Sequence, residues 1–159
     1  MGDSENSTVD FYINPSKTFQ SVRKADVFKE MIEEITAESF IALDKEEVLE
    51  EIEKREALST TGFGNGFAIP HGKSSQIHTP VVVLMKSEQK LEWEALDDQP
   101  VSIIFLLIVP KEQGEAIHLK LLARLSYHLM DKKVQQEFKD RKTQAELENL
   151  LEQLLVEKG

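Results

Sequence analysis

The chain has 159 residues, of which 40% are hydrophobic and 30% charged, a size and composition typical of one globular domain. It carries 19 Lys and Arg against 29 Asp and Glu, and a net charge of −10 argues against a nucleic-acid partner, whose phosphates require basic residues. It contains no cysteine, which excludes disulfides, thiolate metal sites and a cysteine nucleophile.

The ends of the chain bear on domain organisation and location. Residues 1–8 are polar and acidic and lack the basic and apolar regions of a signal peptide. We expect residues 1–10 to form a flexible tail and residues 11–159 to form a single domain. The longest unbroken apolar run, residues 103–109, is too short for a membrane-spanning helix, so we expect a cytoplasmic protein.

The first third of the domain predicts one short strand and two helices. Residues 12–13 are candidates for a strand near the N-terminus. From Val22 to about Thr36, apolar residues recur on one helical face. The next helix begins with a capping box, in which Asp44 accepts from the N3 amide while Glu47 reaches back, and it should end near Ala57.

The middle of the chain predicts strands. Residues 81–85 and 103–109 are short, continuous apolar runs rich in branched side chains, as in strands that are covered on both faces. Residues 67–69 form a shorter candidate strand. Helices before, between and after such strands indicate an α/β sandwich with helices on both faces of the sheet.

Two further helices are expected after the last of these strands. One should begin near Glu115. The other starts at residues 143–146, which repeat the capping-box pattern. Its leucines recur at the spacing of one helical face: Leu147, Leu150, Leu151, Leu154 and Leu155.

The segment before the first central strand is rich in glycine. Gly62, Gly64 and Gly66 alternate, and glycine permits positive φ and a close approach to a ligand. Successive amides in such a turn can bind an anion, which makes Gly64, Asn65 and Gly66 a candidate phosphate loop. Taken alone, the pattern also fits a plain flexible loop, because it lacks the ending of a P-loop and precedes a strand.

A histidine and an arginine in the same segment strengthen the phosphate interpretation. Pro70 and Gly72 flank His71, and we expect a turn that holds the imidazole at the end of strand 67–69, where ligands bind in α/β sheets. Arg55 can bind phosphate oxygens through two parallel donors. A lone histidine would more often be structural, but the three features together predict a phosphate site.

The other histidines are less specific. His118 lies on the apolar face of the helix expected from Glu115, where it is either a core residue or a second imidazole that donates to the phosphoryl group. His128 lies about 15 Å further along that helix, so the two cannot share one compact site, and we expect His128 and His78 to be surface or flanking residues. A metal site of His71, His78 and His118 stays open, although no motif supports it.

At this point a resemblance becomes specific. Residues 55–73, REALSTTGFGNGFAIPHGK, closely resemble the active-site signature of enzyme IIA in the fructose/mannitol/nitrogen-regulatory family of the bacterial phosphoenolpyruvate:sugar phosphotransferase system. Residues 98–101 and 118–122 are similar to the family's downstream pattern, and the resemblance covers nearly the whole chain from about Phe11. It implies a three-layer α/β/α fold with a mixed sheet, a phosphorylated His71, a phosphate-steadying Arg55 and a second active-site histidine at His118.

The resemblance also implies partners. His71 would take a phosphoryl group from the carrier HPr and pass it to enzyme IIB, which works with a membrane permease, in a fructose-type system. We expect Arg55 to favour the neutral imidazole that attack requires. Phosphoryl transfer depends mostly on positioning and charge stabilisation, so no metal or nucleotide cofactor is needed. The site should be shallow and open, with Phe63 and Phe67 offering apolar surface to the partner or packing in the core.

Two other functions fit these residues. In the nitrogen-regulatory branch of the same family, phosphorylation of the residue that corresponds to His71 would control binding to a target protein. A metal-dependent hydrolase would instead use His71, His118 and acidic residues, and stoichiometric metal in the purified protein would support it.

Overall fold

The computed structural model describes residues 9–38, 40–112 and 114–156, apart from the side chains of residues 114, 115, 117 and 118. Residues 1–8 of the predicted tail lie outside this description, and the first strand already begins at Asp10, within the predicted tail. The elements follow in the order β1 (Asp10–Lys17), α1 (Lys24–Ala37), α2 (Lys45–Leu58), β2 (Gly62–Gly64), β3 (Phe67–Ala68), β4 (His71–Ser74), β5 (Val81–Leu91), β6 (Val101–Pro110), α3 (Gly114–Leu129), α4 (Lys132–Asp140) and α5 (Gln144–Leu155).

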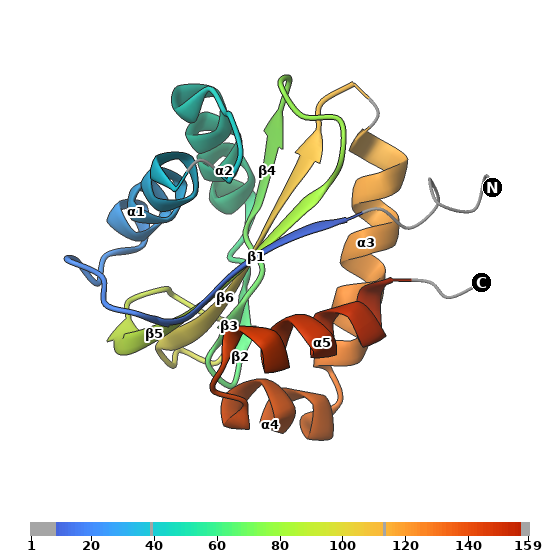
Figure 1. Ribbon diagram of the computed structural model, residues 1–159. Helices are drawn as coiled ribbons and strands as arrows, with labels where there is room; N and C mark the ends of the chain where they lie inside the picture. Colours follow the sequence, from blue (N-terminus) through green and yellow to red (C-terminus); the bar gives the residue numbers. More distant parts are fainter. Residues whose placement is uncertain (1–8, 39, 113, 157–159) are drawn as a thin grey trace.

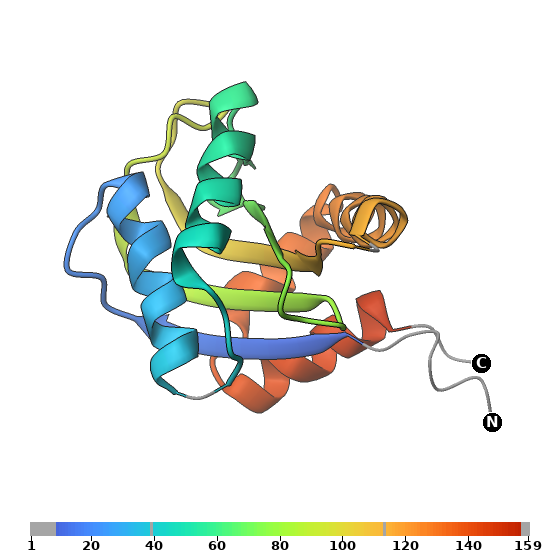
Figure 2. The same cartoon turned by 90° about the horizontal axis from the view of Figure 1, so that it is seen from above.

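Helices cover both faces of one central sheet (Figures 1 and 2), with α1 and α2 on one face and α3, α4 and α5 on the other. Successive side chains of a strand point to opposite faces, so β6 contributes to a core on each side. Ile104 and Leu106 pack with α1 and α2, whereas Ile103 and Phe105 pack with α3, α4 and α5. The predicted three-layer α/β/α sandwich is confirmed.

The described residues form a six-stranded mixed sheet in the order β1-β5-β6-β3-β2, with β4 also paired to β6. β1 is parallel to β5, β5 is antiparallel to β6, and β2 is antiparallel to β3. β3 and β4 both run parallel to β6, one after the other along the same edge. The break between them falls at Ile69–Pro70, where proline has no amide hydrogen to donate. The carbonyl of Pro70 still accepts from the amide of Leu107 at 2.9 Å, which keeps the line in register.

The helix starts follow the predicted caps with one difference. The Asp44 carboxylate accepts from the amide of Glu47, as expected. Glu47 does not complete the predicted capping box, because its carboxylate instead accepts from the amide and the hydroxyl of Ser75. At α5 the full capping box of Thr143 and Glu146 is present, and that prediction is confirmed.

The sequence patterns did not reveal α4. Its buried side chains are Gln135 and Phe138, so it lacks a broad apolar stripe. A distant lysine holds its end, because Lys86 Nζ donates to the carbonyls of Phe138, Lys139 and Arg141 at 2.8, 3.2 and 2.7 Å. In the described part of the chain, no helix combines the length and the apolar character that crossing a bilayer requires.

Candidate functional site

His71 is the first residue of β4 rather than part of a turn, which corrects the expectation for Pro70–Gly72. It pairs with Leu107 of β6, whose side chain packs in the core beneath α3, α4 and α5. Paired residues of neighbouring strands direct their side chains to the same face, so the imidazole points toward this side of the sheet. The prediction of a turn was wrong because β4 continues the parallel pairing with β6 beyond the proline.

Gly72 lets α2 approach the opposite face of β4. A Cβ atom at this position would lie 3.0 Å from Cγ1 of Ile52 and 3.2 Å from Cγ1 of Val48. Helix and strand therefore lie in direct contact. Arg55 follows Ile52 by three residues, which places it next to this contact on the surface of α2.

We expect Gly72→Ala to lower the free energy of unfolding by about 1–3 kcal/mol, because the added methyl group would overpack the buried contact with Ile52. Urea unfolding measures the effect, with Lys73→Ala at the neighbouring half-buried position as a control that should stay near the wild type. Equal stability of the Gly72 variant and the wild type would mean that α2 does not lie against β4 in this way.

Arg55 and His71 line two pockets together. One, of about 470 Å³, lies between α2 and β4 and is completed by Glu51, Lys54, Leu58, Gly72 and Lys73. The other, of about 430 Å³, is completed by Thr60, Thr61, Phe63, Ile69, Leu122, Ser126 and Met130. The structure therefore brings the predicted imidazole and guanidinium together, and we call the two pockets that they share the cleft; residues of α2 line the first pocket, and residues of α3 line the second.

The cleft is more enclosed than the expected open site, because His71 is only 7% exposed. Its rim includes two exposed apolar side chains, Leu58 at 82% and Met130 at 79%. Of the two phenylalanines considered, Phe67 is fully buried in the core, whereas the half-buried Phe63 lines the second pocket.

Arg55 lies in the last turn of α2, where its Nη1 donates to the carbonyl of Ser59 at 2.8 Å. This bond satisfies a carbonyl just beyond the helix end and anchors the guanidinium at the cleft. Among the side chains that the structure describes, no carboxylate forms an ion pair with Arg55. An anion entering the cleft would therefore meet a guanidinium that no described acidic group neutralises.

The glycine-rich turn has a different neighbour. Gly64, Asn65 and Gly66 have φ values of 120°, 58° and 90°, the left-handed conformations that alternating glycines allow. The amide of Asn65 donates to the Asp97 carboxylate at 3.0 Å, and its side chain donates to Gln135 at 3.1 Å. These three residues line neither pocket of His71, so the structure does not bring the predicted phosphate loop to the imidazole.

Two of the remaining three histidines lie at the surface. His78 is exposed, and His128 is half-buried beside Tyr127, so both lie at the surface as expected. Position 118 belongs to α3, but its side chain lies outside the described residues. No group of three or more His, Asp or Glu side chains that could hold a metal is found among the described residues.

Some residues of the cleft were not predicted. Leu122 and Ser126 of α3 line it together with Met130, the first residue after that helix. They follow position 118 at intervals of four residues, which is the spacing of one helical stripe, so the helix period could have identified them. Thr60 and Thr61 lie between the predicted Arg55 and the glycines and carried no pattern of their own.

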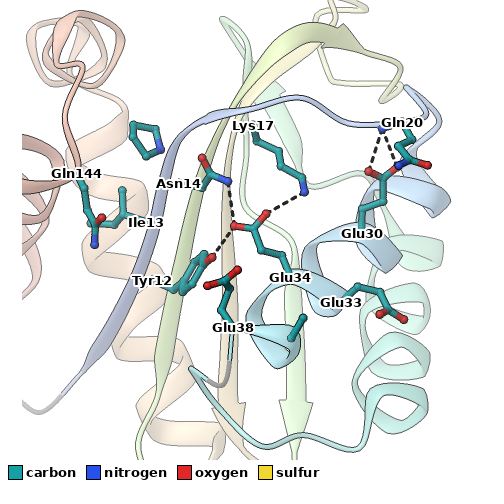
Figure 3. Close-up of a pocket in the computed structure, with 12 residues that line it drawn as sticks. Tyr12, Ile13, Asn14, Lys17, Gln20, Glu30, Glu33, Glu34, Glu38 and Gln144 are labelled. Carbon is teal, nitrogen blue, oxygen red and sulfur yellow. Dashed lines mark hydrogen bonds and ion pairs between the residues drawn. The ribbon is translucent and has the colours of Figure 1, made fainter.

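A third pocket, of about 780 Å³, lies between β1 and α1 and gathers acidic side chains (Figure 3). Among them, Glu34 accepts hydrogen bonds from Tyr12 Oη at 2.5 Å and Asn14 Nδ2 at 2.9 Å, and Lys17 Nζ lies 2.8 Å from its other oxygen. The remaining carboxylates are those of Glu30, Glu33 and Glu38. This excess of negative charge makes the pocket unsuitable for phosphate.

Glu34 predicts a pH-dependent stability. Burial raises the pKa of its carboxyl, but hydrogen bonds from Lys17, Tyr12 and Asn14 outweigh burial and hold the pKa below its ordinary value. The stabilisation is therefore complete above the unfolded pKa of about 4.3 and is lost as the pH falls through the lower folded pKa. We expect Glu34→Gln to unfold at lower urea concentration than the wild type at pH 7, with the difference shrinking toward pH 3.

The control for this variant is Glu33→Gln, which changes an exposed carboxylate on the same helix and should have little effect at either pH. A difference between Glu34→Gln and the wild type that stays constant from pH 7 to pH 3 would contradict the role of the charge.

The comparisons with known proteins come from sequence and from structure. The family model described as "Phosphoenolpyruvate-dependent sugar phosphotransferase system, EIIA 2" matches residues 12–154. The chain is 30% identical over 112 residues to the PTS system fructose-specific EIIA component of Haloferax volcanii, covering 70% of this chain and 72% of that one. It is 38% identical over 106 residues to a nitrogen regulatory protein of Escherichia coli, covering 66% of this chain and 64% of that one, just under two thirds of its length.

Solved structures agree with the fold. Nitrogen regulatory protein IIA-Ntr from Neisseria meningitidis superposes with a TM-score of 0.74 at 26% identity, covering 87% of this chain and 95% of that one. A complex of enzyme IIAMTL and phosphorylated enzyme IIBMTL from Escherichia coli matches with a TM-score of 0.64 at 16% identity, covering 89% of this chain and 97% of that chain, a likeness in fold alone.

Proposed function

Because the chain belongs to the EIIA type 2 family of the phosphoenolpyruvate-dependent sugar phosphotransferase system, we propose that it is a phosphocarrier in which His71 accepts a phosphoryl group from phospho-HPr and passes it to an enzyme IIB. One observation carries the proposal: the imidazole on β4 and the guanidinium of Arg55 on α2 line the same two pockets. This shared lining supports the proposal in addition to family membership.

The proposed transfer is a displacement at phosphorus between two imidazoles. A nitrogen of neutral His71 forms the new N–P bond in line with the N–P bond of the donor phosphohistidine, which breaks and leaves its electron pair on the donor ring. Charge spreads over the three phosphoryl oxygens in the loose transition state. Arg55 stabilises that charge through two parallel donors. We assign His118 the role of a second imidazole that donates to the same oxygens.

The surroundings of the cleft fit a protein as the donor. Leu58 and Met130 expose most of their apolar side chains at its rim, and large exposed apolar groups mark sites of protein association. A partner that covers them would exclude water from the transferring group, which strengthens the interaction of Arg55 with the phosphoryl oxygens. The enclosure of His71 requires that the partner's histidine project into the cleft.

A second candidate is a regulatory IIA of the nitrogen type. The similarity to nitrogen regulatory proteins, at 38% identity and in the Neisseria structure, favours it, while the Haloferax relative favours fructose-type transport. Both would use phosphorylation of His71. Passage of phosphate to a cognate IIB, dependent on sugar, supports transport through a membrane permease. Capture of a non-transport protein by only one phosphorylation state supports regulation.

Incubation of the purified chain with phosphoenolpyruvate, enzyme I and HPr tests the proposal. We expect a phosphate that is stable in alkali and labile in acid, as an N–P bond to histidine is, and that moves to an added IIB domain. Omission of HPr is the control and should leave the chain unlabelled. The proposal fails if the complete mixture leaves no label, or a label that resists acid.

A further inference from the structure

Glu56 follows Arg55 in the last turn of α2, and its side chain is only 6% exposed. An ionised carboxylate in such a place is costly unless it is paired and hydrogen-bonded. Glu56 follows Ile52, the residue in contact with β4, by four positions, so it lies on the same side of the helix. A buried charge at the helix end that carries Arg55 therefore calls for an explanation.

Both oxygens of the Glu56 carboxylate are engaged. Oε2 accepts from the amide of Thr61 at 2.9 Å and from Lys24 Nζ at 3.1 Å. Oε1 accepts from the hydroxyl of Thr61 at 2.7 Å. Thr61 is thus held by its main chain and its side chain together, and Lys24 at the start of α1 balances the charge.

Thr61 connects the hydrogen bonds of Glu56 to the strand that carries His71. Its carbonyl accepts from the amide of Ile69 at 3.0 Å, which extends the pairing of β2 with β3 by one step. Ile69 precedes His71 by two residues, and the intervening Pro70 is fixed by its ring and by its bond to Leu107. Thr61 and Ile69 also line the pocket that Arg55 and His71 share.

We propose that Glu56 is a positioning residue for phosphoryl transfer at His71: its buried carboxylate clamps the end of α2 to Thr61 and so sets the guanidinium of Arg55 against the imidazole. The apolar contact at Gly72 brings α2 close to β4, but apolar contacts are non-directional. The three hydrogen bonds of Glu56 supply the direction, because they fix the rotation of the helix end. The inference rests on the proposed function.

Lys24 has a second role in this arrangement. A carboxylate paired with the guanidinium of Arg55 would compete with phosphate, but Arg55 and Glu56 are successive residues of a helix and do not face each other. The Glu56 charge is instead directed to Lys24 on α1, so Arg55 keeps its charge for the cleft. The pairing of Glu56 with Lys24 therefore orients the end of α2, and it also leaves the guanidinium of Arg55 available to phosphate.

The test compares Glu56→Gln with Glu53→Gln, which changes an exposed carboxylate one turn earlier on α2. Rates of transfer from phospho-HPr are measured at limiting and at saturating donor. We expect kcat of Glu56→Gln to fall about 10- to 100-fold. KM should stay within about twofold of the wild type, since so buried a side chain cannot touch the donor. Glu53→Gln should match the wild type in both.

Two further variants separate positioning from folding and from charge. Thr61→Val keeps the main-chain hydrogen bond to Glu56 but loses the hydroxyl, so we expect kcat to fall less than in Glu56→Gln. Urea unfolding shows whether this variant is folded under the conditions of the assay. The double variant Glu56→Gln/Lys24→Met removes both charges and should remain slow. A wild-type kcat in Glu56→Gln, in Thr61→Val or in the double variant would overturn the inference. Failure of the wild type itself to be labelled would instead overturn the proposed function.

Discussion

Replacement of His71 by alanine is expected to abolish phosphorylation of the chain by phosphoenolpyruvate, enzyme I and HPr. Among the described histidines, His71 is the one that lines the pockets of Arg55, and its imidazole nitrogen is the atom proposed to receive the phosphoryl group. The loss should be complete rather than partial, because a nucleophile that forms the bond cannot be replaced by its surroundings. Radiolabel retained after alkali treatment measures it.

The control variants for this experiment are His78→Ala and His128→Ala, which remove surface histidines and should leave labelling unchanged. His71→Asn provides a polar replacement in the strand, and circular dichroism shows whether each variant remains folded. Full labelling of a folded His71 variant would remove this residue from the mechanism.

Replacement of Arg55 by alanine is expected to lower the rate of transfer by about 10²- to 10³-fold, the usual effect of removing one preorganised donor from a developing anion. Arg55→Lys should fall between alanine and the wild type, because lysine keeps the charge but lacks the planar fork of two donors. Single-turnover phosphorylation by phospho-HPr gives these rates directly.

Lys54→Ala is the matched control for Arg55. Lys54 lines the first pocket but its side chain is 71% exposed, so we expect a change in rate of less than about threefold. A wild-type rate in Arg55→Lys would show that a point charge is sufficient and would contradict the two-donor role. Arg55→Ala also removes the hydrogen bond to the carbonyl of Ser59, so unfolding in urea is measured alongside the rate.

Sequence periodicity predicted the layers of this fold because the strongest signals are local. The runs at residues 81–85 and 103–109 are apolar at every position, since both faces of β5 and β6 are covered by helices. β4 and α4 escaped prediction because their stability comes from distant partners. β4 is polar at three of its four residues and depends on pairing with β6, and α4 is held at its end by Lys86.

The candidate site likewise combines residues that the local sequence predicts with contacts to distant partners that it does not predict. Arg55 and His71 were identified from residue type and local spacing, and α2 and β4 bring them to one cleft. The glycine-rich turn was expected to hold phosphate, but an anion from the chain itself, Asp97, occupies its amide. Neither Asp97 nor the pairing of Glu56 with Lys24 could be predicted, because in both cases the partner lies 32 residues away with no periodic relation.

The continuation of β3 into β4 along one edge of β6 has a consequence for the order in which the phosphoryl donor and acceptor would bind. His71 is held in a sheet strand, flanked by the bond between Pro70 and Leu107, so it cannot swing from one docking site to another. In the proposed cycle, donor and acceptor must therefore bind at the same site, one after the other, and cannot be bound together. Unphosphorylated HPr in excess would then act as a competitor of IIB, and delivery would proceed by alternating occupancy.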